Sequence, residues 1–170
     1  MIARLSPAEL DSCAGELGAV LVDVVDGGNS VGFLLPLELS AATAWWRGLV
    51  PAVADGSVQM WAARTGEDLC GTVQLRLAAM PNGLHRAEVA KLMVAPRARG
   101  RGLGRELLAT VERAAVESGV SLLILDTETG SAAESLYRSA GWTQVGTVPD
   151  YAADPRGELQ PTTFFYKRVG

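Results

Sequence analysis

The sequence has few of the residues that build metal and disulfide sites. It contains one histidine, His85, and two cysteines, Cys13 and Cys70, which stand far apart and in neither metal-ligand nor redox spacing. A metal site would need several carboxylates around the single histidine, so we expect no metal. Isolated thiols are typical of a reducing compartment, and we expect a cytoplasmic protein whose two cysteines are free.

A basic excess and long apolar runs are also missing. Lys and Arg number 15 against 19 Asp and Glu, which gives a formal net charge of −4. Proteins that bind nucleic acid or anionic membranes present a broad basic surface instead. No apolar run reaches the roughly 20 residues that span a bilayer, and the opening segment MIARLSPAEL has no signal-peptide core. We therefore expect neither nucleic acid nor a membrane as a partner.

The composition is that of a globular protein. Apolar residues make up 48% of the chain and charged residues 20%. A length of 170 residues suits one domain with a continuous apolar core. No repeat, linker or low-complexity stretch divides the chain, so residues 1–170 are expected to form a single domain.

Helices are predicted at four places from their capping and apolar spacing. They are residues 6–26, which open on the capping box Ser6-Pro7-Ala8-Glu9; residues 40–56, interrupted at Pro51; residues 103–119, ended by Gly119; and residues 131–141.

Short β-branched and apolar runs between turn residues predict the strands. Residues 58–64, 69–78 and 87–94 follow one another and should pair antiparallel, and two further strands, 142–148 and 162–169, close the chain. The run LLILD at 122–126 follows the helix 103–119, and such a strand–helix–strand crossover implies a parallel pair. The predicted fold is α/β, with a mixed, mainly antiparallel sheet, a central parallel crossover and helices on both faces.

A glycine- and arginine-rich loop separates the strand 87–94 from the helix 103–119. Glycines let backbone N–H groups approach an anion, and the helix N-terminus adds a partial positive charge. A nucleotide P-loop would need a Gly-Lys pair, which the chain lacks, and a dinucleotide fingerprint would need glycine where Arg105 stands. The remaining pattern is R-x-x-G-x-G, running from Arg99 to Gly104.

This pattern resembles the acyl-coenzyme A loop of the GNAT family of N-acetyltransferases. The preceding strand, AEVAKLMV, and the later segment LLILDTETGSAAESLYRSAGW, with its L-Y-x-x-x-G-[FW] pattern, extend the resemblance across nearly the whole chain. Many members carry Asn near the start of the last helix, where this chain has Ser131. The resemblance implies that acetyl-CoA is bound by Leu92, Met93, Val94, Arg99, Gly100, Arg101, Gly102, Leu103, Gly104, Arg105 and Ser131.

The resemblance also implies direct attack of an amine on acetyl-CoA, without a covalent enzyme intermediate. Tyr137, in the L-Y-x-x-x-G-[FW] pattern, would protonate the departing thiolate. Two carboxylates are candidates for the base. Asp126 ends an apolar strand at the edge where open α/β sheets bind ligands, and Glu88 lies on the neighbouring strand. Alternatively, Asp126 caps the next turn and Glu88 pairs with Lys91.

The acceptor is less constrained by the sequence. Trp45, Trp46, Tyr151 and His85 are candidates for an acceptor pocket, although aromatic residues at such positions also build cores. The favoured acceptor is the primary amine of a small molecule, such as a toxin or an antibiotic. The alternatives are a protein N-terminus or lysine, and a non-catalytic module that binds acyl-CoA. A homodimer stays open, because many members of the family dimerise.

Overall fold

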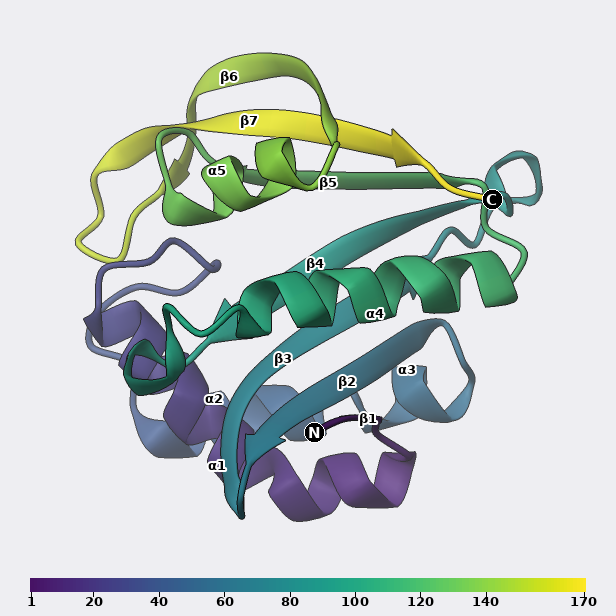
Figure 1. Cartoon of the computed structure of the whole chain (residues 1–170). Helices are drawn as coiled ribbons and strands as arrows, with labels where there is room; N and C mark the ends of the chain where they lie inside the picture. The colour runs from purple at the N-terminus through teal and green to yellow at the C-terminus, as the bar shows by residue number, and fades with distance from the viewer.

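The computed structural model describes all 170 residues, and a single mixed sheet runs through the protein (Figure 1). Its seven strands lie in the order β1-β2-β3-β4-β5-β7-β6. The strands are β1 (Ile2–Arg4), β2 (Val58–Thr65), β3 (Asp68–Leu77), β4 (Arg86–Val94), β5 (Leu122–Glu128), β6 (Thr143–Ala153) and β7 (Leu159–Arg168).

Helices cover both faces of the sheet, as predicted. On one face α1 (Pro7–Asp26), α2 (Leu39–Arg47) and α3 (Val50–Ala54) pack on β2 and neighbouring strands. On the other face α4 (Leu103–Glu117) and α5 (Ala132–Ser139) cover the sheet (Figure 1). Each face has its own apolar core of 16 buried residues. None of the helices is both long and apolar enough to cross a membrane.

The first helix begins where its capping box predicts. The Ser6 side chain accepts a hydrogen bond from the backbone N–H of Glu9, and the Glu9 carboxylate accepts one from the backbone N–H of Ser6 at 2.7 Å. Two N–H groups that the helix cannot satisfy itself are thereby paired. The helix then buries residues such as Leu10, Leu17 and Leu21 completely against the sheet.

The sheet is split between β4 and β5. These two strands are the parallel pair that the crossover through α4 predicts, but only Arg86–Glu88 pair with Leu122–Ile124. Beyond these residues the strands diverge, as Figure 1 shows. Backbone groups on the facing edges of β4 and β5 therefore have no strand partner over most of their length.

A bulge in β4 lies next to this split. The pairing of β3 with β4 shifts in register between Thr72 and Gln74, opposite Lys91 and Leu92. Lys91 has a φ of 51°, in the left-handed region that non-glycine residues rarely adopt. Such bulges re-aim side chains next to functional sites.

Three elements differ from the sequence-based expectation. The strand β1 was not predicted, because its three residues are too few to show an alternating pattern. The stretch 40–56 forms two helices rather than one interrupted helix, since Pro51 stands in the first turn of α3, where a proline starts a helix without losing a hydrogen bond. The strand β6 continues to Ala153, well beyond the predicted end at residue 148.

Candidate active site

A cleft of about 720 Å³ opens where β4 and β5 diverge. Its walls come from the loop between α1 and α2, the β4 bulge, the arginine-rich loop, the end of β5, and α5. Among the residues predicted from the sequence, it is lined by Glu88, Leu92, Met93, Val94, Arg99, Gly100, Gly102, Leu103, Gly104, Arg105, Asp126, Ser131, Tyr137 and Tyr151.

The arginine-rich loop presents a row of free backbone donors to this cleft. None of the N–H groups from Gly100 to Arg105 donates a hydrogen bond within the protein. Gly100 and Gly102 have φ values of 76° and 81°, which glycine adopts without strain. Gly102 is also the N-cap of α4, so the positive end of the helix dipole lies here. Successive free N–H groups at a helix N-terminus form a binding site for phosphate groups.

The four arginines in the loop and the first turn of α4 have different roles. Arg97 forms an ion pair with Asp23 of α1 at 3.0 Å, and Arg105 donates to the hydroxyl of Ser139 on α5 at 2.7 Å. Arg99 donates to the side chain of Asn29 at 2.8 Å and thereby links the loop to the segment between α1 and α2. Arg101 is exposed, lies outside the cleft lining and has no hydrogen-bond partner for its side chain in the protein.

The two faces of the sheet divide the cleft into two halves. Along β5, Leu123 and Leu125 pack in the core under α4 and α5, so Asp126 lies on the opposite face. Along β4, Ala87 and Val89 pack in the same core, which puts Glu88 on the face of Asp126. Both carboxylates therefore lie on the side of α1 and α2, whereas the phosphate-binding loop opens α4 on the other side.

Tyr137 stands on α5 at the boundary between the halves. Its ring packs against Trp142 and Phe165 at centroid distances of 5.9 and 6.1 Å, and only 5% of the residue is exposed. Its hydroxyl has no hydrogen-bond partner in the protein. Burial, together with the nearby charge of Asp126, raises the pKa of this phenol above its usual value. Tyr137 therefore stays protonated and able to donate a hydrogen bond or a proton.

The surroundings of Asp126 suit a proton acceptor. The carboxylate is exposed toward the cleft, yet the surrounding protein desolvates it and raises its pKa, while the positive charge of Lys91 opposes the shift. A raised pKa makes a carboxylate a stronger base. Glu88 is half-buried in the same cleft and forms no salt bridge with Lys91, although the sequence left that pairing open.

Ser131 combines a structural position with a place in the cleft. It is the N-cap of α5, where its hydroxyl accepts a hydrogen bond from the N–H of Glu134 at 3.2 Å. The same oxygen lies 3.3 Å from the hydroxyl of Thr127. Its hydroxyl therefore helps to start α5 where this helix borders the cleft.

Lys91 is a cleft residue that the sequence offered only as a partner for Glu88, not as a site residue. Its ammonium donates a hydrogen bond of 2.9 Å to the carbonyl oxygen of Val31 and lies over the rings of Phe33 and Trp45. Desolvation and the positive charge of Arg76 lower the pKa of this ammonium. The unusual backbone of the bulge gave no signal in the sequence.

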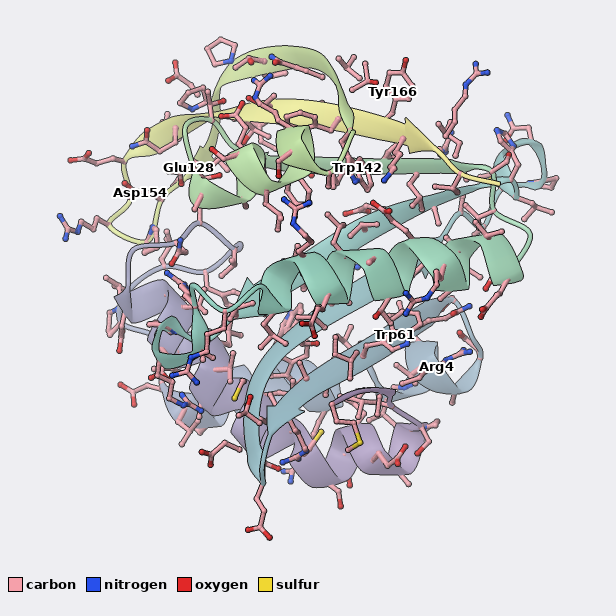
Figure 2. The ribbon with its side chains drawn as sticks, in the orientation of Figure 1. Arg4, Trp61, Glu128, Trp142, Asp154 and Tyr166 are labelled. Carbon is pink, nitrogen blue, oxygen red and sulfur yellow. The ribbon has the colours of Figure 1, made fainter.

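Glu128 is a second cleft residue that was not predicted as a site residue. It lies two positions after Asp126 and so on the same face of β5, and one of its carboxylate oxygens is buried without a partner. Burial and the neighbouring charge of Asp154, visible beside it in Figure 2, raise the pKa of this carboxyl group. The alternation of side chains along the strand could have found Glu128.

The aromatic candidates of α2 lie outside the cleft lining. Trp46 is completely buried, and we place it in the core under α1 rather than in an acceptor pocket. Trp45 contacts Phe33 at 5.2 Å between ring centroids and reaches the cleft only through Lys91. His85 stands exposed in the turn before β4 and also lies outside the lining. Tyr151, by contrast, lines the cleft and packs edge-on against Phe164.

These features fit acetyl-CoA. Free N–H groups at the start of α4 suit the pyrophosphate, and the open edge of β4 suits an extended arm that carries amide groups. The hydroxyl of Tyr137 and the carboxylates Glu88 and Asp126 line the same cleft. The arrangement can therefore bring a thioester and an amine together from opposite faces of the sheet.

Comparisons with known proteins agree with this geometry. The profile of the Acetyltransferase (GNAT) family matches residues 18–142. The chain therefore belongs to the acetyltransferase (GNAT) family.

Individual relatives are distant. An IAA acetyltransferase from Azospirillum brasilense is 39% identical over 69 residues, which are 40% of this chain and 45% of that protein. The chain spans less than half the length of the curated relatives that it matches.

Two solved structures superpose over nearly the whole fold. A ribosomal-protein-alanine N-acetyltransferase from Brucella melitensis is 26% identical, with a TM-score of 0.76 and 99% of each chain covered. The protein yncA from Salmonella typhimurium, solved with its cofactor acetyl-CoA, is 17% identical, with a TM-score of 0.77 and coverage of 100% of this chain and 94% of that chain. At this identity the second likeness concerns the fold alone.

Proposed function

We propose that this protein transfers the acetyl group of acetyl-CoA to a primary amine of a small molecule, by direct attack in a ternary complex. The observation that carries the proposal is the meeting of three features in one cleft. These are the free N–H groups from Gly100 to Arg105, the protonated hydroxyl of Tyr137, and the carboxylates Glu88 and Asp126.

The residues of the chain divide the work of the transfer. Acetyl-CoA supplies the acetyl group as a thioester. Acetyl-CoA would be held by the open edge of β4, by the arginine-rich loop and by the start of α5. The residues are Leu92, Met93, Val94, Arg99–Arg105 and Ser131. Asp126 or Glu88 accepts the proton of the amine, directly or through water, as the new N–C bond forms. Tyr137 donates a proton to the sulfur as the C–S bond breaks.

The resemblance of several segments suggests the kind of acceptor. Five segments of the chain resemble, in the same order, segments of the tabtoxin resistance protein. They are GGNSVGF, AEVAKLMV, ARGRGLGRELL, LDTETGS and PTTFFYK. On that ground the proposed acceptor is a toxin or an antibiotic, with tabtoxinine-β-lactam as the first compound to test. The pocket role of Tyr151, and of Trp45 through Lys91, belongs to this proposal.

One comparison favours a second candidate. The Brucella melitensis neighbour is a ribosomal-protein-alanine N-acetyltransferase, and it covers 99% of this chain. An acceptor at a protein N-terminus is therefore the alternative to a small molecule.

The proposed location is the cytoplasm. Cys13 and Cys70 are free and buried, which accords with a reducing compartment.

The experiment that tests the proposal measures release of coenzyme A thiol from acetyl-CoA. Acceptors are a panel of small amines that includes tabtoxinine-β-lactam, and a peptide with an N-terminal alanine. Turnover of a small amine supports the proposal, and turnover of the peptide alone favours the alternative. Acetyl-CoA binding without thiol release for any acceptor would indicate a non-catalytic module. Light scattering on the same sample decides between monomer and homodimer.

A further inference from the structure

Arg76 is a cation in the cleft that lacks an anionic partner. It lies on β3 directly opposite Glu88 of β4 and lines the cleft. Its Nε donates a hydrogen bond of 3.1 Å to the side-chain oxygen of Gln74, which is completely buried. Its two terminal nitrogens donate to no protein atom, and no carboxylate lies within ion-pair distance. Gln74 thus holds one edge of the guanidinium and leaves the other edge free.

Arg76 faces the half of the cleft that the acceptor would enter. Val73 and Leu75 pack in the core under α4, so the alternation along β3 puts Arg76 on the face of α1 and α2. Glu88 and Asp126 lie on the same face. The positive charge of Arg76 is therefore separated by the sheet from the free N–H groups at the start of α4.

Acidic and basic side chains alternate in the half of the cleft that faces α1 and α2. Asp126 lies near the hydroxyl of Tyr137 and near Lys91, since its charge influences the pKa of both groups. Lys91 in turn lies near Glu88 and Arg76. The ammonium of Lys91 already donates to the carbonyl oxygen of Val31 and lies over two aromatic rings. Arg76 is therefore the cation of this half whose terminal donors are free for a ligand.

A partly desolvated arginine with free terminal donors suits one ligand group in particular. Its planar fork matches a carboxylate with two parallel N–H···O hydrogen bonds. Desolvation and the positive charge of Arg76 both lower the pKa of Lys91, and an anion placed here would offset the repulsion between the two cations. Glu88 and Asp126 supply the complementary negative charge for an amine.

We propose that Arg76 binds a carboxylate of the acceptor, so that the acceptors are amino acids or amino-acid-like molecules whose amine lies at Glu88 and Asp126. Arg76 is then a specificity-determining residue rather than a participant in the acetyl transfer. The inference rests on the proposed N-acetyltransferase function and narrows its substrate class.

Matched acceptors test the inference. Phenylalanine, methionine and leucine are each compared with their amide and with their decarboxylated amine (phenethylamine, 3-(methylthio)propylamine and 3-methylbutylamine) in the thiol-release assay. The amide has a less basic amine than the amino acid, and the decarboxylated compound a more basic one. A difference in basicity therefore cannot make the amino acid a better acceptor than both its amide and its decarboxylated amine. We expect kcat/KM for the amino acid to be roughly 10- to 100-fold higher than for either compound, which corresponds to one charged hydrogen-bonded contact.

Variants assign that preference to Arg76. Arg76→Met should lower kcat/KM for the best amino acid by roughly 10- to 100-fold through a higher acceptor KM. It should leave the matched decarboxylated amine and the KM for acetyl-CoA unchanged. Arg76→Lys should restore part of the loss. Arg86→Met, which removes an exposed arginine at the start of β4, is the matched control and should behave as wild type.

The outcomes separate this inference from the proposed function. Equal turnover of amino acids and decarboxylated amines, or an equal loss for both in Arg76→Met, overturns the role of Arg76 and leaves acetyl transfer intact. Turnover of no acceptor by a wild-type protein that is stabilised by acetyl-CoA overturns the catalytic function itself. The Tm of each variant, with and without acetyl-CoA, verifies that it is folded.

Discussion

The ammonium of Lys91 donates a hydrogen bond of 2.9 Å to the carbonyl oxygen of Val31. A residue of the β4 bulge thus holds the loop between α1 and α2, which forms one wall of the cleft. The aromatic rings of Phe33 and Trp45 lie 6.0 and 5.6 Å from the same ammonium. The position of this wall therefore depends on one side chain of the sheet.

Lys91→Met tests that dependence. Methionine keeps an apolar stem but removes the donor, so residues 27–38 should exchange their backbone hydrogens faster with solvent. Hydrogen exchange followed by mass spectrometry measures the change. Arg168→Met, at the exposed end of β7, is the control and should leave this loop as it is. Unchanged exchange in residues 27–38 would contradict the role of Lys91.

The acetyl-CoA site is tested by Gly102→Val. Acetyl-CoA at 100 times its dissociation constant should stabilise the wild-type fold by about 2.7 kcal/mol. Valine is strained at the φ of 81° found at Gly102 and should disturb the neighbouring N–H groups, so most of this stabilisation should be lost. Thermal unfolding with and without acetyl-CoA measures it.

Gly119→Val is the matched control for backbone strain. Gly119 has a φ of 77° and lies at the other end of α4, outside the cleft. Its replacement should also lower the Tm, yet the stabilisation by acetyl-CoA should persist. Equal stabilisation of both variants would mean that the loop does not bind the pyrophosphate.

Tyr137→Phe removes only the hydroxyl and keeps the ring packed against Trp142 and Phe165. Because a general acid contributes roughly 100- to 10,000-fold, kcat should fall within that range while the affinity for acetyl-CoA stays near wild type. Steady-state kinetics with the best acceptor give the answer. Tyr166→Phe, outside the cleft lining, is the control. A kcat for Tyr137→Phe within about twofold of wild type would leave this residue a purely structural role.

The pH dependence tests Asp126. If it is the base, the acidic limb of kcat/KM lies above the usual pKa of aspartate, because desolvation raises the pKa of this carboxyl group. Asp126→Asn should remove that limb, and Glu88→Gln should keep it. The opposite pattern would assign the base to Glu88.

The same shift predicts an effect on stability. A carboxyl group whose pKa is raised by folding favours the fold below its unfolded pKa, and this contribution is lost as the pH rises through the folded pKa. At neutral pH the ionised Asp126 therefore lowers stability. Asp126→Asn should raise the Tm while it lowers activity, which differential scanning calorimetry at pH 7 would measure. An unchanged or lower Tm would contradict the desolvation of this side chain.

A stability prediction concerns Glu112 on α4. Its carboxylate accepts hydrogen bonds from the indole of Trp142 at 2.8 Å and from Lys167 of β7 at 2.7 Å. Glu112→Ala leaves the partly buried indole N–H of Trp142 unpaired and removes the anionic partner of Lys167, whose ammonium keeps only its hydrogen bond to the carbonyl oxygen of Ala140. The change should cost roughly 1–3 kcal/mol in the free energy of unfolding. Urea denaturation measures the loss. Glu117→Ala, at an exposed position of the same helix, should have little effect, and an equal loss there would contradict the prediction.

The sequence predicts most of the fold because its signals are local. The capping box at Ser6 and Glu9 starts α1, and the continuous apolar run of Leu122–Leu125 marks a strand after a crossover helix. Only one face of that strand is buried, because Leu123 and Leu125 pack in the core while Ile124 is exposed. The α/β class, the antiparallel run β2-β3-β4 and the parallel pair β4–β5 are all confirmed.

Residues that enter the site through tertiary placement were not predicted as site residues. Lys91 enters the cleft through a bulge, and a bulge depends on how two strands pair rather than on either sequence. Arg76 lies in the cleft because the strand register puts it opposite Glu88. Gln74 fixes one edge of its guanidinium, which no sequence pattern indicates. Trp46 is the opposite case, a residue that the sequence offered for the acceptor pocket and that packs in the core. Its neighbour Trp45 contacts Lys91 instead.

The split between β4 and β5 has a consequence for solubility. Open strand edges are sites where other chains can add a strand, and proteins normally protect them with charge, prolines or covering elements. Here the two unpaired edges face each other inside the sheet, beneath the loop between α1 and α2 and beside α5. A protein that keeps strand edges open for a ligand can thereby remain resistant to aggregation, because those edges are recessed from neighbouring molecules.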